Sequence, residues 1–182
     1  MTRIAFETTI EAPPQQVWDI LADFGGVYRY NPSVVRSYLT AGSPGGPDSQ
    51  RHCDLTFSGA AVDERIVEWR DGDGYVLDIV DGTNMPPFRG APRAELTIRA
   101  AGEARTHVRG QLTYRLRFGP LGILMDRLMV RRRFGPAFGG VIAGLKHHAE
   151  TGELVTADTR LQPIDHITER RSASNPRALV TH

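Results

Sequence analysis

The sequence predicts an α+β domain in which seven antiparallel strands form one curved sheet around a single long C-terminal helix. Three observations support this. Short segments with alternating apolar and polar residues recur across residues 3–118. Turns rich in Gly, Pro and Asp separate these segments, which favours hairpins and an antiparallel meander. Residues 121–150 instead carry apolar side chains at helical spacing, and this segment is long enough to cover the sheet.

The chain is predicted to begin with a strand followed by two short helices. Residues 3–11 alternate between apolar and polar side chains, as expected of a half-buried strand. Prolines 13 and 14 end that strand, and a proline suits the first turn of a helix. Trp18 and Leu21 belong to the apolar stripe of this first helix, and a second helical turn is predicted at residues 27–30.

Six more strands are expected before the long helix. They are predicted at residues 34–39, 51–58, 61–70, 75–80, 94–100 and 106–118. The sequence Asp-Gly-Asp-Gly at 71–74 is a strong hairpin signal. The loop at 81–90 differs from the other connections because its tip, from Met85 to Phe88, is apolar.

The predicted helix at 121–150 would be ~45 Å long. Pro136 is expected to kink it near Arg132 or to start a second segment, because proline lacks the backbone N–H. Four glycines, at 135, 139, 140 and 144, lie in the same helix, and each costs about 1 kcal/mol relative to alanine. They either leave room for a ligand over the sheet or allow the helix backbone to pack closely on it.

Length and composition indicate one domain, at residues 1–152 of 182, followed by a flexible tail at 153–182 that has few large apolar residues. The net charge is +1, so no overall field attracts nucleic acid, and no nucleic-acid partner is expected. Cys53 is the only cysteine, which fits a cytoplasmic protein without disulfides. No apolar run reaches 18 residues, so no transmembrane segment is predicted. Neither a metal site nor a cofactor is expected.

Two motifs resemble the START-like, or SRPBCC, superfamily and within it the polyketide cyclase/dehydrase branch. The first is Ile10-Glu11-Ala12-Pro13 followed by Val17-Trp18-Asp19-Ile20-Leu21-Ala22-Asp23. The second is Leu145-Lys146-His147-His148-Ala149-Glu150 at the end of the long helix. The resemblance covers residues 3–152 and implies a helix-grip fold with an apolar cavity between sheet and helix. It further implies binding of lipids, polyketides or isoprenoids, and in some members cyclisation or dehydration of polyketides.

Large apolar side chains, some with hydroxyl groups, are the candidates for lining such a cavity. The alternative is that most of them are ordinary core residues. The candidates are Tyr28, Tyr30, Phe57, Met85, Phe88, Tyr114, Met125, Phe134, Phe138 and Val141.

Glu64 and Arg65 are neighbours in a predicted strand, so one of the two must point inward. An inward carboxylate needs a partner, and Arg93 is one candidate. With Tyr114 or an arginine, Glu64 could polarise a ketone and assist an aldol closure. The alternative is an ion pair at the surface. His52 and Cys53 cannot form a catalytic dyad, because adjacent strand residues face opposite sides.

Arg131, Arg132 and Arg133 form a local basic cluster that could make weak contact with a membrane or an acidic partner, or could simply be solvated. Three functions therefore remain open. The protein binds a hydrophobic small molecule, it is a polyketide cyclase/aromatase or dehydrase, or it is an interaction module with a vestigial cavity. The enzyme hypothesis requires at least two polar residues converging inside the cavity.

Overall fold

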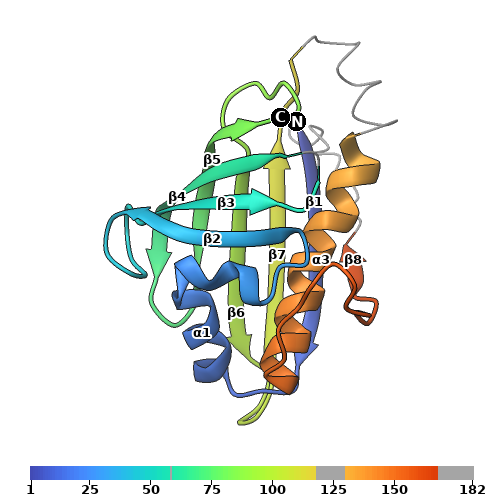
Figure 1. The fold of residues 1–182 in the computed structure, drawn as a ribbon. Helices are drawn as coiled ribbons and strands as arrows, with labels where there is room; N and C mark the ends of the chain where they lie inside the picture. The colour runs from blue at the N-terminus through green and yellow to red at the C-terminus, as the bar shows by residue number, and fades with distance from the viewer. Residues whose placement is uncertain (58, 118–129, 168–182) are drawn as a thin grey trace, which may run out of the picture.

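The computed structural model describes residues 1–57, 59–117 and 130–167, which form one curved antiparallel sheet with α3 packed against one face (Figure 1). The elements are β1 (Thr2–Ile10), α1 (Pro14–Ala22), η1 (Phe24–Arg29), β2 (Val34–Ala41), β3 (Gln50–Leu55), β4 (Ala61–Arg70), β5 (Gly74–Thr83), β6 (Arg93–Ala100), β7 (Thr106–Tyr114), α3 (Arg131–Thr151) and β8 (Asp165–Ile167). The strands are hydrogen-bonded in the order β2-β3-β4-β5-β6-β7-β1-β8. This is the helix-grip arrangement that the sequence predicted.

The sheet curls strongly, so that β2 and β3 run across the view of Figure 1 while β6, β7 and β1 run along it. Irregular pairing contributes to this curvature. The register between β4 and β5 shifts between Asp63 and Glu64 and again between Ile66 and Glu68. Such bulges increase the local twist of a strand pair. The sheet therefore wraps around the helix instead of lying flat beneath it.

The long helix α3 packs on β1 and β7 through a buried stripe that includes Ile142, Leu145 and Ala149. It runs as one helix through Pro136, so this proline does not begin a separate segment. Gly152 ends the helix in the left-handed conformation, with φ of 75°, which a residue without a side chain adopts readily. The predicted N-terminal part of the helix, residues 121–129, lies outside the described residues.

The two short helices lie near one end of the sheet, between β1 and β2 in the chain. Pro14 is the first residue of α1, as predicted, and Val17 and Leu21 are fully buried. Trp18 packs against Trp69 of β4, with ring centroids 4.8 Å apart. These contacts attach the helices to the sheet. None of the described helices is both long and apolar enough to cross a membrane.

Within the described residues the sheet has eight strands, so the prediction of seven was wrong by one. The eighth, β8, pairs with the free edge of β1 through Ala5–Ile167 and Glu7–Asp165. His166 lies edge-on to Phe6, with ring centroids 4.9 Å apart. Part of the segment that we expected to be a tail therefore pairs with the domain. A strand of three mostly exposed residues is too short to show an alternating pattern.

Candidate functional site

A cavity of about 130 Å³ lies between the sheet and α3. A cavity of about 150 Å³ can hold a single aromatic ring. Most of the lining is apolar, and it comes from η1, from β3 to β7 and from α3. The lining residues are Val27, Tyr30, Asn31, Ser33, Arg51, Leu55, Phe57, Val62, Glu64, Tyr75, Leu77, Ile79, Met85, Ala94, Leu96, Leu112, Phe134, Ala137, Phe138 and Val141. The internal space is thus an apolar pocket with a few polar groups.

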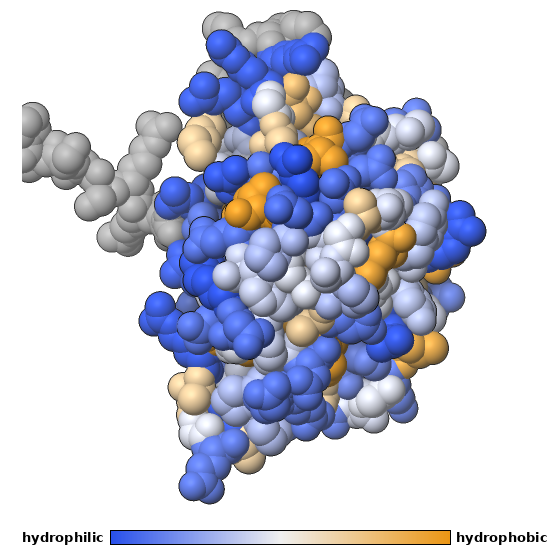
Figure 2. Space-filling model, turned by 90° about the vertical axis from the view of Figure 1, so that its left-hand side faces the viewer, coloured by the Kyte–Doolittle hydropathy of each residue, from blue (hydrophilic) through white to orange (hydrophobic). Residues whose placement is uncertain are grey.

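The outer surface offers no comparable apolar site in the view of Figure 2. The face shown there is mostly hydrophilic, and its hydrophobic side chains are separate spots, not one continuous patch. Isolated exposed hydrophobic residues are normal on a protein surface. The cavity is therefore the best candidate for an apolar ligand.

The helix contributes side chains to the cavity and glycines to packing. Phe134, Ala137, Phe138 and Val141 follow helical spacing and line the cavity. Gly139, in contrast, lies against the ring of Phe6, where an added Cβ would come within 2.9 Å of Cζ.

Two other glycines pack in the same way. A Cβ on Gly140 would lie 3.2 Å from Pro32, and a Cβ on Gly144 would overlap the carbonyl oxygen of Tyr30. These glycines permit close approach of the helix. Only Gly135 has open space beside it among the four helix glycines.

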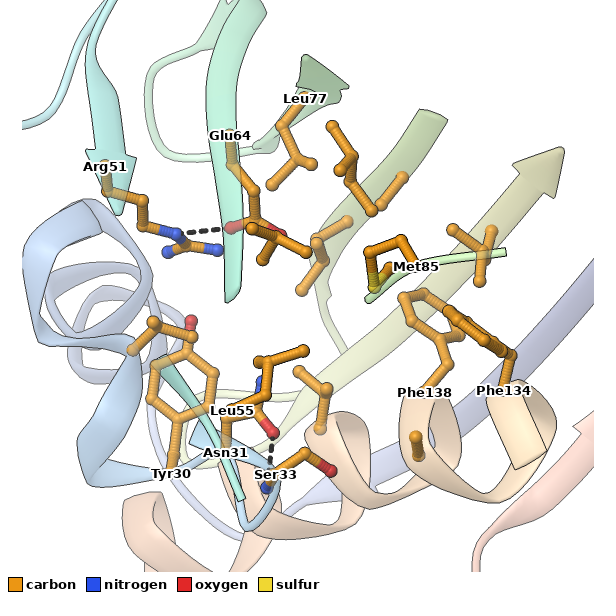
Figure 3. A pocket seen from close by; sticks show the side chains of 18 of the residues that line it. Tyr30, Asn31, Ser33, Arg51, Leu55, Glu64, Leu77, Met85, Phe134 and Phe138 are labelled. Atoms are coloured by element: carbon orange, nitrogen blue, oxygen red, sulfur yellow. Dashed lines mark hydrogen bonds and ion pairs between the residues drawn. The ribbon is translucent and has the colours of Figure 1, made fainter. Parts of the chain in front are cut away.

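The charged end of the cavity consists of Arg51 on β3 and Glu64 on β4, which are cross-strand neighbours (Figure 3). Arg51 Nε lies 2.6 Å from Glu64 Oε2, and the two side chains are 5% and 14% exposed. Arg51 Nη1 donates to the carbonyl of Phe24 at 2.7 Å, and its guanidinium lies 3.9 Å from the centroid of the Phe24 ring. Burial is the largest single influence and lowers the pKa of Arg51, but the Glu64 charge and smaller contributions from Cys53, Tyr75 and Tyr30 together outweigh it, so the net pKa is raised.

Two buried tyrosines and Cys53 surround this ion pair. Burial raises the pKa of Tyr30 and of Tyr75, so both hydroxyls stay protonated and can donate hydrogen bonds. Burial, together with the nearby Glu64 charge, raises the pKa of the Cys53 thiol to about 12. A thiol with so high a pKa is a poor nucleophile. Cys53 is therefore a structural residue beside the site.

Six of the ten predicted ligand-binding residues line the cavity: Tyr30, Phe57, Met85, Phe134, Phe138 and Val141. Tyr28 does not, because η1 turns it outward and leaves it 38% exposed. Met125 lies outside the described residues. Whether the six bind a ligand stays a prediction.

Phe88 and Tyr114 do not line the cavity either. Phe88 packs edge to face against Tyr114 and against Phe134, with ring centroids 5.7 Å and 5.9 Å apart. The backbone at Phe88 bridges to Leu116, and the Arg89 amide donates to the Arg115 carbonyl at 2.7 Å. The apolar loop tip is thereby fastened to the end of β7.

Of the three catalytic candidates, only Glu64 reaches the cavity. Arg93 is exposed and forms an ion pair with Asp78 at 2.7 Å, so it cannot be the partner of Glu64. Tyr114 is buried against Phe88 and is not among the residues that line the cavity. The partner of Glu64 is Arg51, which sequence reasoning missed. The signal was available, because Arg51 alternates with the apolar residues Cys53 and Leu55 and therefore shares their face of the strand.

Arg132 and His52 are not among the residues that line the cavity. Arg132 is exposed on α3, while the side chains of Arg131 and Arg133 are not among those described. His52 faces the outer side of the sheet, where its Nδ1 lies 2.6 Å from Asp63. Within the described ranges, no group of three His, Cys, Asp or Glu residues is placed to hold a metal ion.

A family model described as polyketide cyclase / dehydrase and lipid transport matches residues 1–150. The chain belongs to this family. No curated protein matches the chain in sequence.

Solved structures support the same fold at low sequence identity. A protein from Thermus thermophilus superposes with a TM-score of 0.66 at 21% identity, covering 81% of this chain and 97% of that one. A Thermobifida fusca protein gives 0.63 at 19%, covering 82% and 93%. A START superfamily protein from Mycobacterium smegmatis gives 0.63 at 16%, covering 81% and 97%. This family member therefore shares the START-like fold.

Proposed function

We propose that the protein binds a hydrophobic small molecule of the polyketide, lipid or isoprenoid class in the cavity between the sheet and α3. The observation that carries the proposal is the unfilled apolar space beside an otherwise closely packed helix. Gly139 and Gly144 bring the helix backbone against Phe6 and Tyr30, so loose packing does not explain the space. The cavity is instead bounded by side chains that meet around it, as in ligand pockets.

Native mass spectrometry of the purified protein, followed by thermal unfolding of the delipidated protein with added ligands, tests this proposal. A ligand that binds only the folded state raises the melting temperature. Ala137→Phe, which adds a ring to the cavity wall, should abolish the rise, whereas Asp54→Asn on the outer face should leave it unchanged. A melting temperature that does not change with any hydrophobic ligand would contradict the proposal.

A second candidate is a polyketide cyclase/aromatase or dehydrase acting in the same cavity. It is favoured by the convergence of Arg51, Glu64, Tyr30 and Tyr75 at one end. In such a reaction the Glu64 carboxylate would remove a proton next to a ketone, and the guanidinium or a tyrosine hydroxyl would stabilise the enolate oxygen. Incubation with a poly-β-ketone and detection of ring closure or water loss tests it. Equal product yield from the wild type and Glu64→Gln would rule out this role for Glu64.

Exposed arginines beside the cavity suggest a second, weaker contact, with a membrane or an acidic partner. Arg89, Arg115 and Arg132 are exposed near the aromatic cluster of Phe88 and Phe134. This basic rim could contact an anionic membrane or an acidic partner, and sedimentation with anionic vesicles at low and high salt tests the membrane case. The single buried free thiol, Cys53, fits our proposal of a cytoplasmic location.

A further inference from the structure

The cavity is polarised along its length. Arg51 and Glu64 lie together at one end, with the Tyr30 hydroxyl pointing toward them, while Phe134 and Phe138 lie at the other end (Figure 3). Arg51 is the only cation and Glu64 the only anion among the described residues of the lining. Because these charges compensate each other at 2.6 Å, the polar end carries no net charge.

Glu64 uses only one of its two carboxylate oxygens in this pair. Oε2 accepts from Arg51 Nε at 2.6 Å and lies 3.9 Å from Cys53 Sγ. Oε1 accepts no hydrogen bond from the described residues, yet no buried polar side-chain atom described here lacks a partner. Oε1 is therefore not sealed in the protein, and Glu64 borders the cavity. An ionised carboxylate oxygen in that position can accept a hydrogen bond but cannot donate one.

The chemistry of a matching ligand follows from this acceptor. A second carboxylate would place like charges side by side in a space with no additional cation among the described lining residues. An ammonium group would meet the Arg51 charge at the same end. A ketone or ether would leave Oε1 without a donor. A neutral hydroxyl donates to Oε1 and can accept from a tyrosine hydroxyl, so it satisfies the site without adding charge.

We infer that the cavity selects a neutral ligand about one aromatic ring in size whose hydroxyl group points to Glu64. This inference rests on the proposed function, and it adds the class and orientation of the ligand. The volume of about 130 Å³ sets the size of the part that fits without movement of the walls. A longer ligand would extend beyond this volume.

Calorimetric titration of the delipidated wild-type protein at neutral pH with three matched probes tests the inference. The probes are p-cresol, which donates a hydrogen bond, 4-methylanisole, which cannot, and 4-methylbenzoate, which is an anion. We expect p-cresol to bind about tenfold or more tightly than either of the others, since an unpaired buried polar group is costly. Equal affinity of p-cresol and 4-methylanisole, or tighter binding of 4-methylbenzoate, overturns the inference but leaves the proposed function intact.

A charge change at Glu64 sharpens the test. In Glu64→Gln the Arg51 charge loses its counter-ion and the new amide can donate, so the order should invert in favour of 4-methylbenzoate. The matched control is Asp54→Asn, which also removes one negative charge, from the neighbouring strand β3. Because Asp54 pairs with Arg36 on the outer face of the sheet, this variant should keep the wild-type order. If the Gln variant does not fold, the wild-type series decides alone. Failure of all three probes to bind overturns the inference and counts against the proposed function too.

Discussion

Arg51 and Glu64 face each other across β3 and β4 with 2.6 Å between Nε and Oε2, inside the curve of the sheet. A buried ion pair contributes little net stability, because desolvation of both charges offsets their attraction. Removal of one partner is different, because it leaves the other charge buried and unpaired. The pair therefore fixes the polar end of the cavity more than it stabilises the fold.

Replacement of one partner should cost far more than replacement of both. We expect Arg51→Met to lower the free energy of unfolding by about 3–5 kcal/mol, because it leaves the Glu64 carboxylate unpaired. The double variant Arg51→Met/Glu64→Leu should recover most of that loss. Urea denaturation measures both. Asp54→Asn, which removes the exposed pair with Arg36, is the control and should change stability far less than Arg51→Met. Equal losses in the single and double variants would contradict the coupling.

Two glycines of α3 should respond in opposite directions to the same substitution. A Cβ on Gly144 would overlap the Tyr30 carbonyl oxygen, whereas a Cβ on Gly135 would meet nothing within 4 Å. We expect Gly144→Ala to destabilise the fold, and Gly135→Ala to stabilise it by up to about 1 kcal/mol through helix propensity. Thermal unfolding of the two variants measures this. A neutral Gly144→Ala would show that the helix can move away from Tyr30 without cost.

The sequence predicted correctly those elements in which alternating residues or turn residues indicate the local structure. The strand at Ala61–Arg70 was predicted with the bounds that the structure has, and the Gly74 hairpin and the Pro14 helix start were also correct. These features depend on local alternation and turn chemistry. The resemblance drawn from the motifs at residues 10–23 and 145–150 named the family that the comparison shows.

The site was harder to predict because it depends on pairs distant in the chain. The alternation places Arg51 on the same face as Cys53, but only the register with β4 places it opposite Glu64. Tyr28 and Tyr30 are two residues apart, yet the turn of η1 exposes one and buries the other. β8 gave no pattern because an edge strand of three residues buries almost nothing.

His52 should titrate above its ordinary value of 6.5 because of its hydrogen bond to Asp63, with a smaller contribution from Asp54, which Arg36 also contacts. Its raised pKa means that the folded state favours the protonated ring. The stability that this provides is present below about 6.5 and is lost as the pH rises through the folded-state pKa. Asp63→Asn should lower the His52 pKa in an NMR titration. The control is Glu7→Gln, which removes a carboxylate beside His107 and should leave the His52 pKa unchanged. An unchanged His52 pKa in Asp63→Asn would contradict the assignment.

The β8 strand should open far more easily than the strand on the other side of β1. It pairs with β1 over only three residues, Asp165–Ile167, whereas β7 pairs with β1 over the whole length from Thr2 to Ile10. Local opening free energies follow the number of buried contacts and hydrogen bonds in a unit. Native-state hydrogen exchange should therefore give low protection at the amides of β8 and high protection at Val108 in β7. His166 contacts Phe6, whose ring also lies against Gly139 of α3. His166→Ala removes the contact with Phe6, so it should reduce protection in β8 and leave protection at Val108 unchanged. Equal protection in the two strands would mean that β8 is an integral part of the folding unit and not a detachable edge.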